Sequence, residues 1–395
     1  MIAAVRCPVC EGIPFATVLE RHGVPVHQNL LFASEREAVS VPRGDLTMVA
    51  CHACGFVFNR SFDAEALRYT AQYDNTQLAS AVFQDHVRRL VGRMIDECGV
   101  RNAHIVEVGC GKGGFLRALV TDGRANNRGL GFDPSYTGPE QDLGGRLRFE
   151  RRFYDAACTH VPADAVVSRH VIEHVPAPLQ LLGAIGAALA HRPGARLFLE
   201  TPCVAWILEH DVVWDFFYEH CSLFTAGSLT TACERAGFTV DAVDHVFGGQ
   251  YLWLEATNRP PDRVSMNPAR MPELAARFAT GQAAQLARWQ ATVRDRAGAG
   301  RLALWGAAAK GVTFANLVDP DRAAFECLVD INPAKQGRFV PGTGHPIIAP
   351  AGLAGRRIAA VVLLNPNYKD EVMAILREQH LSIDVLDFGA GATTP

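Results

Sequence analysis

The feature that most constrains this 395-residue chain is an apolar run that ends in a glycine-rich loop. Residues 104–108 read HIVEV, the loop at 109–114 reads GCGKGG, and FLRAL follows at 115–119. A buried strand, a glycine turn and a helix, in this order, open a doubly wound nucleotide-binding sheet. The pattern therefore predicts an α/β fold that binds a ligand at the carboxyl end of its first strand.

Glu107 narrows the choice of ligand, because it precedes Gly109 and gives the loop the form ExGxGxG. A carboxylate at this turn would repel the pyrophosphate of a dinucleotide, but not a ligand with an ammonium group and no phosphate. The loop thus favours S-adenosylmethionine (SAM) over NAD. We expect Glu107 and the loop residues Gly109, Cys110 and Gly111 to contact SAM.

The following segments predict the rest of this sheet. Asp133 ends a second strand at 128–133, at the spacing from the loop where a carboxylate accepts hydrogen bonds from a ribose. We expect Asp133, its neighbour Pro134, and His170 after the fourth strand to complete the cofactor site. The other expected strands are 146–150, 164–168 and 196–202, with a closing hairpin of 240–247 and 251–257.

Two cysteine pairs precede this sheet. Cys7 and Cys10 form one CxxC unit, and Cys51 and Cys54 form a second. Two such turns supply the four thiolates of a tetrahedral Zn²⁺ site, and four thiolates leave no open position for catalysis. We expect a structural zinc ion; the alternative is four thiols that meet no metal.

Several motifs together resemble a known family. The ExGxGxG loop, the later acid and SRHVIEHV at 168–175 resemble class I methyltransferases. Further motifs accompany the paired CxxC units: YDNTQ at 73–77, YEHC at 218–221, DINPAKQG at 330–337 and PGT at 341–343. This combination is similar to the three-part sugar C-methyltransferase family.

The resemblance implies an α/β protein of three parts. A small zinc-binding domain at 1–68 precedes a class I methyltransferase (Rossmann-like) core at 69–260. A second Rossmann-like domain follows at 261–395, without an ExGxGxG loop of its own.

The resemblance also implies a substrate and a chemistry. Members of this family methylate nucleotide-linked 4-keto-deoxysugars at the carbon next to the ketone. A base must remove the α proton, and a donor must stabilise the enolate oxygen. His220 is the candidate base, Glu219 its partner or substitute, and Tyr218 and Tyr73 are candidate phenols over the substrate. The allocation of the base among residues 218–220 stays open.

Several alternatives stay open at this stage. Neighbours on a strand point to opposite faces, so residues 218–220 reach one substrate together only from a turn or a helix start. Otherwise these three residues only hold a loop in place. If a helix follows the fourth strand, His170 and His174 share one face; we expect His170 to meet cofactor or substrate and His174 to pack. Lys310 and Lys335 are candidate phosphate ligands, or else solvated residues of a lid.

The function has rival interpretations as well. An O- or N-methyltransferase would use the same scaffold and the same Tyr-Glu-His. An NAD-dependent oxidoreductase is disfavoured by Glu107, and a non-catalytic scaffold protein is the weakest rival. The substrate is expected to be a small molecule, with a sugar nucleotide as the first choice.

Composition limits the partners and the compartment. The net charge of −3 and the pI near 6.5 give no basic surface for nucleic acid. The apolar runs are strand-length, and no signal segment opens the chain, so we expect a cytoplasmic protein without membrane association. A monomer and a homodimer are equally compatible with the sequence.

Overall fold

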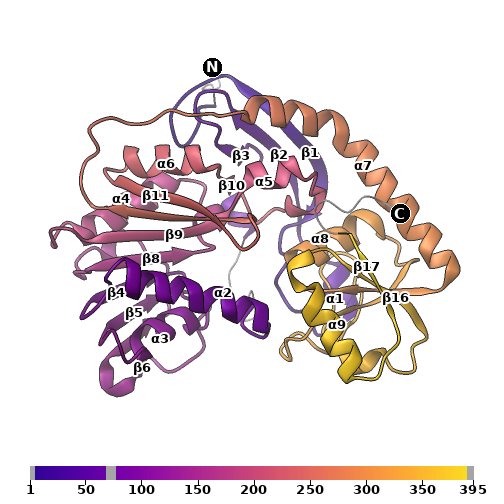
Figure 1. Ribbon diagram of the computed structural model, residues 1–395. Helices are drawn as coiled ribbons and strands as arrows, with labels where there is room; N and C mark the ends of the chain where they lie inside the picture. The colour runs from indigo at the N-terminus through magenta and orange to yellow at the C-terminus, as the bar shows by residue number, and fades with distance from the viewer. Residues whose placement is uncertain (1–4, 68–76, 389–395) are drawn as a thin grey trace.

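The computed structural model describes residues 5–67 and 77–388 and arranges them around three β-sheets (Figure 1). Tyr73 lies outside the described residues. No described helix has both the length and the apolar character needed to cross a membrane.

The first sheet is antiparallel and joins distant parts of the chain. Its strands β1 (Phe15–Pro25), β2 (Arg43–Cys51) and β3 (Val57–Asn59) come from the N-terminal segment. The short strand β10 (Ser222–Leu223) completes the sheet by pairing with β3. The N-terminal segment therefore shares its sheet with the chain directly after YEHC.

The second sheet has eight strands and confirms the doubly wound α/β core. Its order is β11-β12-β9-β8-β4-β5-β7-β6, and the five strands β9, β8, β4, β5 and β7 run parallel. The strands are β4 (His104–Val108), β5 (Arg128–Phe132), β6 (Gln141–Asp142), β7 (Leu147–Glu150), β8 (Ala165–Arg169), β9 (Arg196–Pro202), β11 (Thr239–Val246) and β12 (Tyr251–Thr257).

Alternating side chains of this sheet enter two different cores. Ile105 and Val167 pack with α2 (Ala81–Gly92) and α3 (Gly114–Thr121) on one face. The neighbouring Val106 and Val166 belong to the opposite core, which contains residues of α4 (Pro178–Leu189) and α6 (Ala226–Arg235). This two-residue period explains why the strands read as continuous apolar runs in the sequence.

The third sheet is parallel, in the order β15-β14-β13-β16-β17, as expected for a second Rossmann-like unit. Its strands are β13 (Arg301–Trp305), β14 (Phe325–Val329), β15 (Ile347–Ile348), β16 (Ile358–Leu363) and β17 (Asp384–Asp387). Helices α8 (Ala309–Val318) and α9 (Lys369–Glu378) accompany it.

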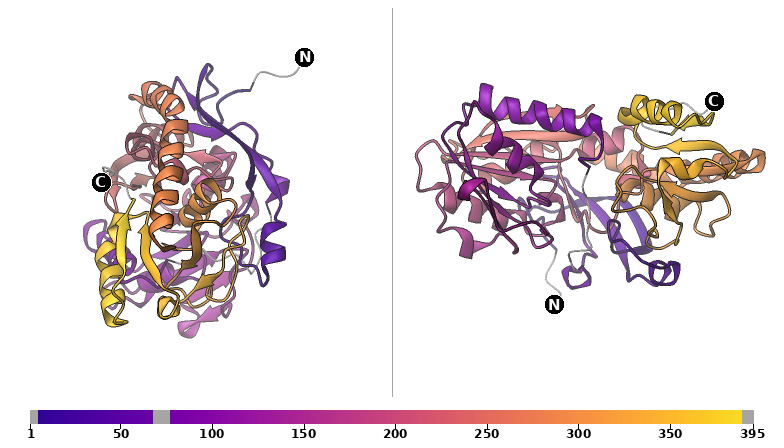
Figure 2. Two further views of the ribbon diagram at one scale, coloured as in Figure 1. Left: turned by 90° about the vertical axis from the view of Figure 1, so that its right-hand side faces the viewer. Right: turned by 90° about the horizontal axis from the view of Figure 1, so that it is seen from below.

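One long helix links the parts. Helix α7 (Met271–Ala299) packs on β1 and β2 and then against β13 and α8. In Figure 1 it runs over the top of the molecule from the N-terminal strands to the C-terminal sheet, and in Figure 2 those strands lie along one side of both larger sheets. The remaining short helices are α1 (Glu35–Val39) and α5 (Val204–Glu209).

The condition under which His170 and His174 would share one helical face is not met. Residues 167–175 do not lead from a strand into an α-helix, because His170 adopts a left-handed φ of 54° and only a single 3₁₀ turn follows at Ile172–His174. His170 and His174 therefore do not share an α-helical face.

Candidate active site between the two parallel sheets

A first cavity opens at the carboxyl ends of β4 and β5, where the cofactor was expected. All seven predicted cofactor residues line it: Glu107, Gly109, Cys110, Gly111, Asp133, Pro134 and His170. The topology explains this, because the carboxyl ends of parallel strands meet at one edge of the sheet.

The glycine loop needs its glycines for space. Gly109 has φ of 72°, and a Cβ there would lie 2.1 Å from Cγ2 of Val171. Asp133 fixes the loop, because its Oδ2 accepts from the Gly111 N–H at 2.8 Å and its Oδ1 accepts from the Ser135 N–H at 2.7 Å. The carboxylate is thus held at the cavity wall with lone pairs to spare for a ribose hydroxyl.

Glu107 lies at the floor of this cavity and is 2% exposed. Its Oε2 accepts from the Leu116 N–H in the first turns of α3 at 3.1 Å. Burial raises the pKa of Glu107 to about 8. A bound cation would lower this pKa again, so the site suits the ammonium group that the sequence argument required.

His170 marks the end of the first cavity and the start of a second. It lines both, as does Gln77. The His170 Nδ1 lies 3.4 Å from Glu173 Oε1 and its Nε2 lies 3.5 Å from Glu200 Oε2. Burial alone would lower the pKa of His170, but the carboxylates of Glu200 and Glu173 raise it to about 9.

Glu200 is itself the centre of a buried polar network. Arg169 Nε donates to its Oε2 at 2.7 Å, and His86 Nε2 lies 2.5 Å from its Oε1. These partners outweigh the burial of Glu200 and hold its pKa well below the usual value. Glu200 therefore acts on the site through His170, whereas Pro202 at the end of β9 lines the second cavity.

The second cavity lies between the two parallel sheets. The central domain contributes Glu173, Asp215, Phe217, His220 and Tyr251 to its wall. The C-terminal domain contributes residues after β13, β14 and β16, among them Lys310, Asp330, Asn332, Lys335 and Asn365. Both sheets thus turn their carboxyl edges toward this cavity.

The YEHC stretch forms a turn that separates its three polar residues. The His220 N–H donates to the Phe217 carbonyl oxygen at 3.1 Å. Of Tyr218, Glu219 and His220, only His220 lines the second cavity. Neighbouring residues of this turn therefore point in different directions, as they would on a strand.

Tyr218 and Glu219 instead contact the N-terminal segment, as in the alternative in which these residues hold a loop in place. The hydroxyl of Tyr218 accepts from the Asp63 N–H at 2.8 Å, and Tyr218 is 1% exposed. Glu219 is fully buried, and its Oε2 accepts from the Gln28 N–H at 2.9 Å. Both side chains act as anchors for the loop.

His220 has the environment of a neutral base. Its ring lies against Phe217 and His174, with centroid distances of 4.0 and 4.8 Å. Burial, followed by the charges of His174, His170 and Lys310, holds the pKa of His220 well below its usual value. Its Nδ1 is buried and has no hydrogen-bond partner within the described part of the chain.

His174 departs from its expectation too. It lines the cofactor cavity and does not pack within a helix. With Glu173 and His220 it forms a group in which one side-chain nitrogen or oxygen of each residue lies within 4.8 Å of the others.

Lys310 and Lys335 both reach the second cavity, each beside an acid. Lys310 Nζ lies 2.7 Å from Asp215 Oδ2 and donates to Gln250 Oε1 at 3.1 Å. Lys335 is 2% exposed; its Nζ donates to the Ala307 carbonyl oxygen at 3.2 Å and lies 3.7 Å from Asp330 Oδ2.

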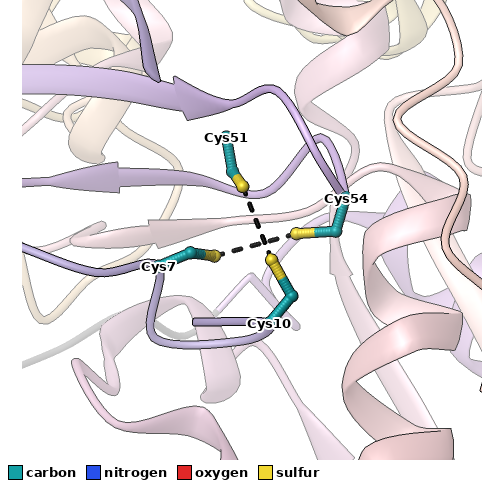
Figure 3. Close-up of side chains that lie close together, drawn as sticks. All are labelled: Cys7, Cys10, Cys51 and Cys54. Carbon is teal, nitrogen blue, oxygen red and sulfur yellow. Dashed lines mark hydrogen bonds between the residues drawn. The ribbon is translucent and has the colours of Figure 1, made fainter. Parts of the chain in front are cut away.

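The four paired cysteines meet at one point, with their sulfur atoms turned toward each other (Figure 3). Sγ of Cys7 lies 3.7 Å from Sγ of Cys54, and Sγ of Cys10 lies 3.5 Å from Sγ of Cys51. A tetrahedral ion with Zn–S bonds of about 2.3 Å sets its sulfurs about 3.8 Å apart. The Gly12 N–H also donates to Cys10 Sγ at 3.4 Å, as a thiolate ligand would accept. The donor set fits a structural zinc ion.

Sequence reasoning missed several cavity residues. Phe217, Asp215 and Asn332 carry no local signal, because their placement depends on contacts between domains. Tyr251 had a usable signal: the predicted hairpin strand at 251–257 returns antiparallel to β9, so its first residue lies at the carboxyl edge of the parallel sheet.

Comparisons with known proteins agree with this geometry. Residues 81–243 match the family described as "Methyltransferase domain", and residues 275–382 match "C-methyltransferase C-terminal domain". The C-methyltransferase NovU of Streptomyces niveus is 26% identical over 390 residues, which cover 93% of this chain and 91% of that protein.

Two of the solved structures that resemble this chain each cover less than half of it. A 1,6-didemethyltoxoflavin N1-methyltransferase of Burkholderia thailandensis, solved with S-adenosylhomocysteine, is 18% identical with a TM-score of 0.35, over 45% of this chain and 81% of that chain. A SAM-dependent methyltransferase of Mesorhizobium loti is also 18% identical with a TM-score of 0.35, over 45% of this chain and all of its own. Likenesses this distant carry no functional argument.

Proposed function

We propose that this chain, a SAM-dependent methyltransferase of the C-methyltransferase family, removes a proton from a carbon next to a ketone and methylates that carbon. The substrate we propose is a nucleotide-linked keto-sugar. The relative NovU is named a C-methyltransferase, and its similarity over almost the whole chain supports the reaction type.

The observation that carries the proposal is the state of His220. It is a half-buried imidazole of lowered pKa whose Nδ1 lacks a partner among the described residues, at the wall of a cavity that meets the cofactor cavity at His170. A neutral imidazole in this position can accept the α proton of a bound ketone. SAM, when bound, supplies an electrophilic methyl group to the carbon that has lost its proton.

The chain's own residues then divide the work. Glu107 and Asp133 are proposed to hold the ammonium and ribose groups of the cofactor. His170, charged and held by two carboxylates, fixes the junction between the cavities.

The C-terminal half of the second cavity is proposed to hold the nucleotide part of the substrate. Asn332 is 8% exposed, and its Nδ2 has no hydrogen-bond partner among described residues, so a polar ligand group is the natural acceptor. Lys310 and Lys335 line the same part of the cavity, where phosphate oxygens can replace or join Asp215 and Asp330 as their partners.

A zinc ion at the four cysteines is the structural part of the proposal. We expect about one zinc per chain in the protein as purified, measured by plasma mass spectrometry. A Cys54→Ser variant should lose the metal and melt at a lower temperature, whereas Cys98→Ser should keep it.

The test of the reaction is mass spectrometry of products formed from SAM and a panel of keto-sugar nucleotides in deuterated water. A product with one added methyl on carbon supports the proposal. His220→Asn should reduce this product and the α-deuterium exchange by about 100-fold or more, the usual loss for a general base. His191→Asn, at an exposed histidine, is the matched control. Methylation on oxygen or nitrogen would contradict the C-methyl assignment, and full exchange by His220→Asn would contradict the base.

A further inference from the structure

The proposed reaction places negative charge on an oxygen, and that oxygen needs a donor. Tyr218 does not supply it here, because its hydroxyl is engaged with the backbone of Asp63 and lies outside the second cavity. Another phenol, Tyr251, does line this cavity, as His220 does, and its ring contacts the ring of His170.

The fold fixes the position of Tyr251. It is the first residue of β12 and pairs with Pro202 at the end of β9, so it sits at the carboxyl edge of the central sheet. Its ring stacks on Phe247 with an interplanar angle of 4° and meets the edge of the His170 ring at 4.6 Å between centroids. A ring held by two neighbours and by its strand has little freedom to move.

The hydroxyl of Tyr251 is the available group. No hydrogen bond joins it to a residue that the structure describes, and Tyr251 is only 6% exposed at the cavity wall. Burial, with the charges of Tyr368, Glu200 and other acids, raises the pKa of the phenol well above its usual value. The group therefore remains an O–H donor throughout the neutral range.

Several other donors of this wall lie beside protein acceptors. Both ring nitrogens of His170 face carboxylates, and Lys310 is paired with Asp215. The hydroxyl of Tyr368 lies 3.3 Å from the side-chain oxygen of Gln77. The hydroxyl of Tyr251, by contrast, has no protein acceptor among the described residues.

We propose that Tyr251 is a catalytic residue, whose hydroxyl donates a hydrogen bond to the substrate ketone oxygen and to the enolate oxygen formed when His220 takes the α proton. This inference rests on the proposed function. The α C–H bond breaks, its proton goes to the imidazole of His220, and its electron pair moves onto the ketone oxygen. When the carbon takes the methyl group, the pair would form the new C–C bond and the C=O bond would return, while the S–CH3 bond of SAM would break and leave its electron pair on the sulfur of S-adenosylhomocysteine. Tyr251 keeps its own proton throughout, and His220 releases the α proton to solvent.

The test compares Tyr251→Phe with wild type in two assays: α-deuterium exchange of a ketone substrate, and methylation with SAM. Loss of one oxyanion donor is expected to slow both by about 100–1,000-fold. Binding of SAM should stay within about twofold, because the cofactor cavity does not include this side chain. Tyr136→Phe is the matched control, since it removes a buried hydroxyl outside both cavities.

Incorporation of 3-fluorotyrosine at position 251 separates hydrogen bonding from packing. It keeps the ring and a more acidic hydroxyl, so exchange should remain at or above the wild-type rate while Tyr251→Phe is slow. Normal exchange by Tyr251→Phe, or slow methylation with normal exchange, would overturn the role of Tyr251. If wild type neither exchanges nor methylates any ketone, the proposed function itself fails, and this inference falls with it.

Discussion

At the scale of single residues, the site sets two histidines to opposite protonation states. Burial and neighbouring positive charge keep His220 neutral, while two buried carboxylates keep His170 charged. Environments that push the pKa values of neighbouring groups apart are the usual sign of a division between base and cation. The two residues therefore predict opposite responses to pH.

The first response is in the rate. His220 acts as a base only when unprotonated, and its pKa lies well below 6.5. We expect kcat/KM for the ketone substrate to stay level as the pH falls from 8 through 6.5, and to decline only at more acidic values. Measuring kcat/KM over pH 5–9 checks this. A decline centred near 6.5 would show that His220 titrates normally or is not the base.

The second response is in stability. His170 has a raised pKa of about 9 in the folded chain against about 6.5 unfolded, so its contribution is fully present below pH 6.5 and is lost as pH rises through 9. The difference in free energy of unfolding between wild type and His170→Asn should shrink over this window by on the order of 3 kcal/mol. Urea unfolding at pH 6 and at pH 9.5 measures it. His210→Asn, on an exposed histidine, should give a difference that does not change with pH.

At the scale of elements, the loop that carries His220 is fastened on both sides to the N-terminal sheet. Tyr218 and Glu219 bond to the backbone of Asp63 and Gln28, and two residues after His220 the chain enters β10 against β3. The cysteine site lies at the end of the same sheet, since Cys51 ends β2. We infer that this segment holds the base in place.

Gly44 offers a probe of this clamp. It lies in β2, and a Cβ there would stand 2.4 Å from Cε2 of Tyr218. Gly44→Ala should cost about 1–3 kcal/mol of stability and displace the loop. We expect kcat to fall at least about tenfold, because small displacements of a catalytic group are costly, while SAM affinity is retained.

Gly183→Ala is the matched control for this probe. Gly183 lies in α4, and a Cβ there meets nothing within 4 Å. It should leave kcat unchanged and stabilise the helix by up to about 1 kcal/mol. If Gly44→Ala lost stability but kept the wild-type kcat, the clamp would have no catalytic role.

The elements also show what the sequence could predict. The strands of both parallel sheets and the cofactor loop follow from local patterns, because apolar runs and glycine turns depend on near neighbours. The directions of Tyr218, Glu219 and His220 depend on a turn that the N-terminal sheet fixes, and β10 has only two residues. The left-handed φ of His170 could not be predicted either, because HVIEH has no glycine to indicate a left-handed backbone conformation at this position.

At the scale of the whole molecule, the C-terminal domain is attached in two different ways. Through α7 it shares an apolar core with the N-terminal sheet, in which Val18 and Phe278 lie with Leu304. Across the second cavity it meets the central domain through polar contacts, such as Asn365 with Gln250. Polar contacts of this kind open at lower cost than an apolar core.

The most concentrated of these polar contacts is made by Glu371 of α9. Its carboxylate accepts from the Ser80 hydroxyl at 2.8 Å and from the Ala81 N–H at 2.6 Å. It therefore caps the start of α2, where a negative charge also favours the helix dipole. Figure 1 shows α2 and α9 at the facing sides of the two domains.

Glu371→Gln should loosen this contact by about 1 kcal/mol, since the amide lacks the charge and one acceptor oxygen. We expect faster hydrogen exchange at residues 80–83 and a KM for the ketone substrate raised about threefold to tenfold, because this contact closes the wall of its cavity. The chemical step, measured in single turnovers, should be little changed. Glu378→Gln, at an exposed position of the same helix, is the control. Unchanged hydrogen exchange at the start of α2 in Glu371→Gln would mean that the two domains are held together without this contact.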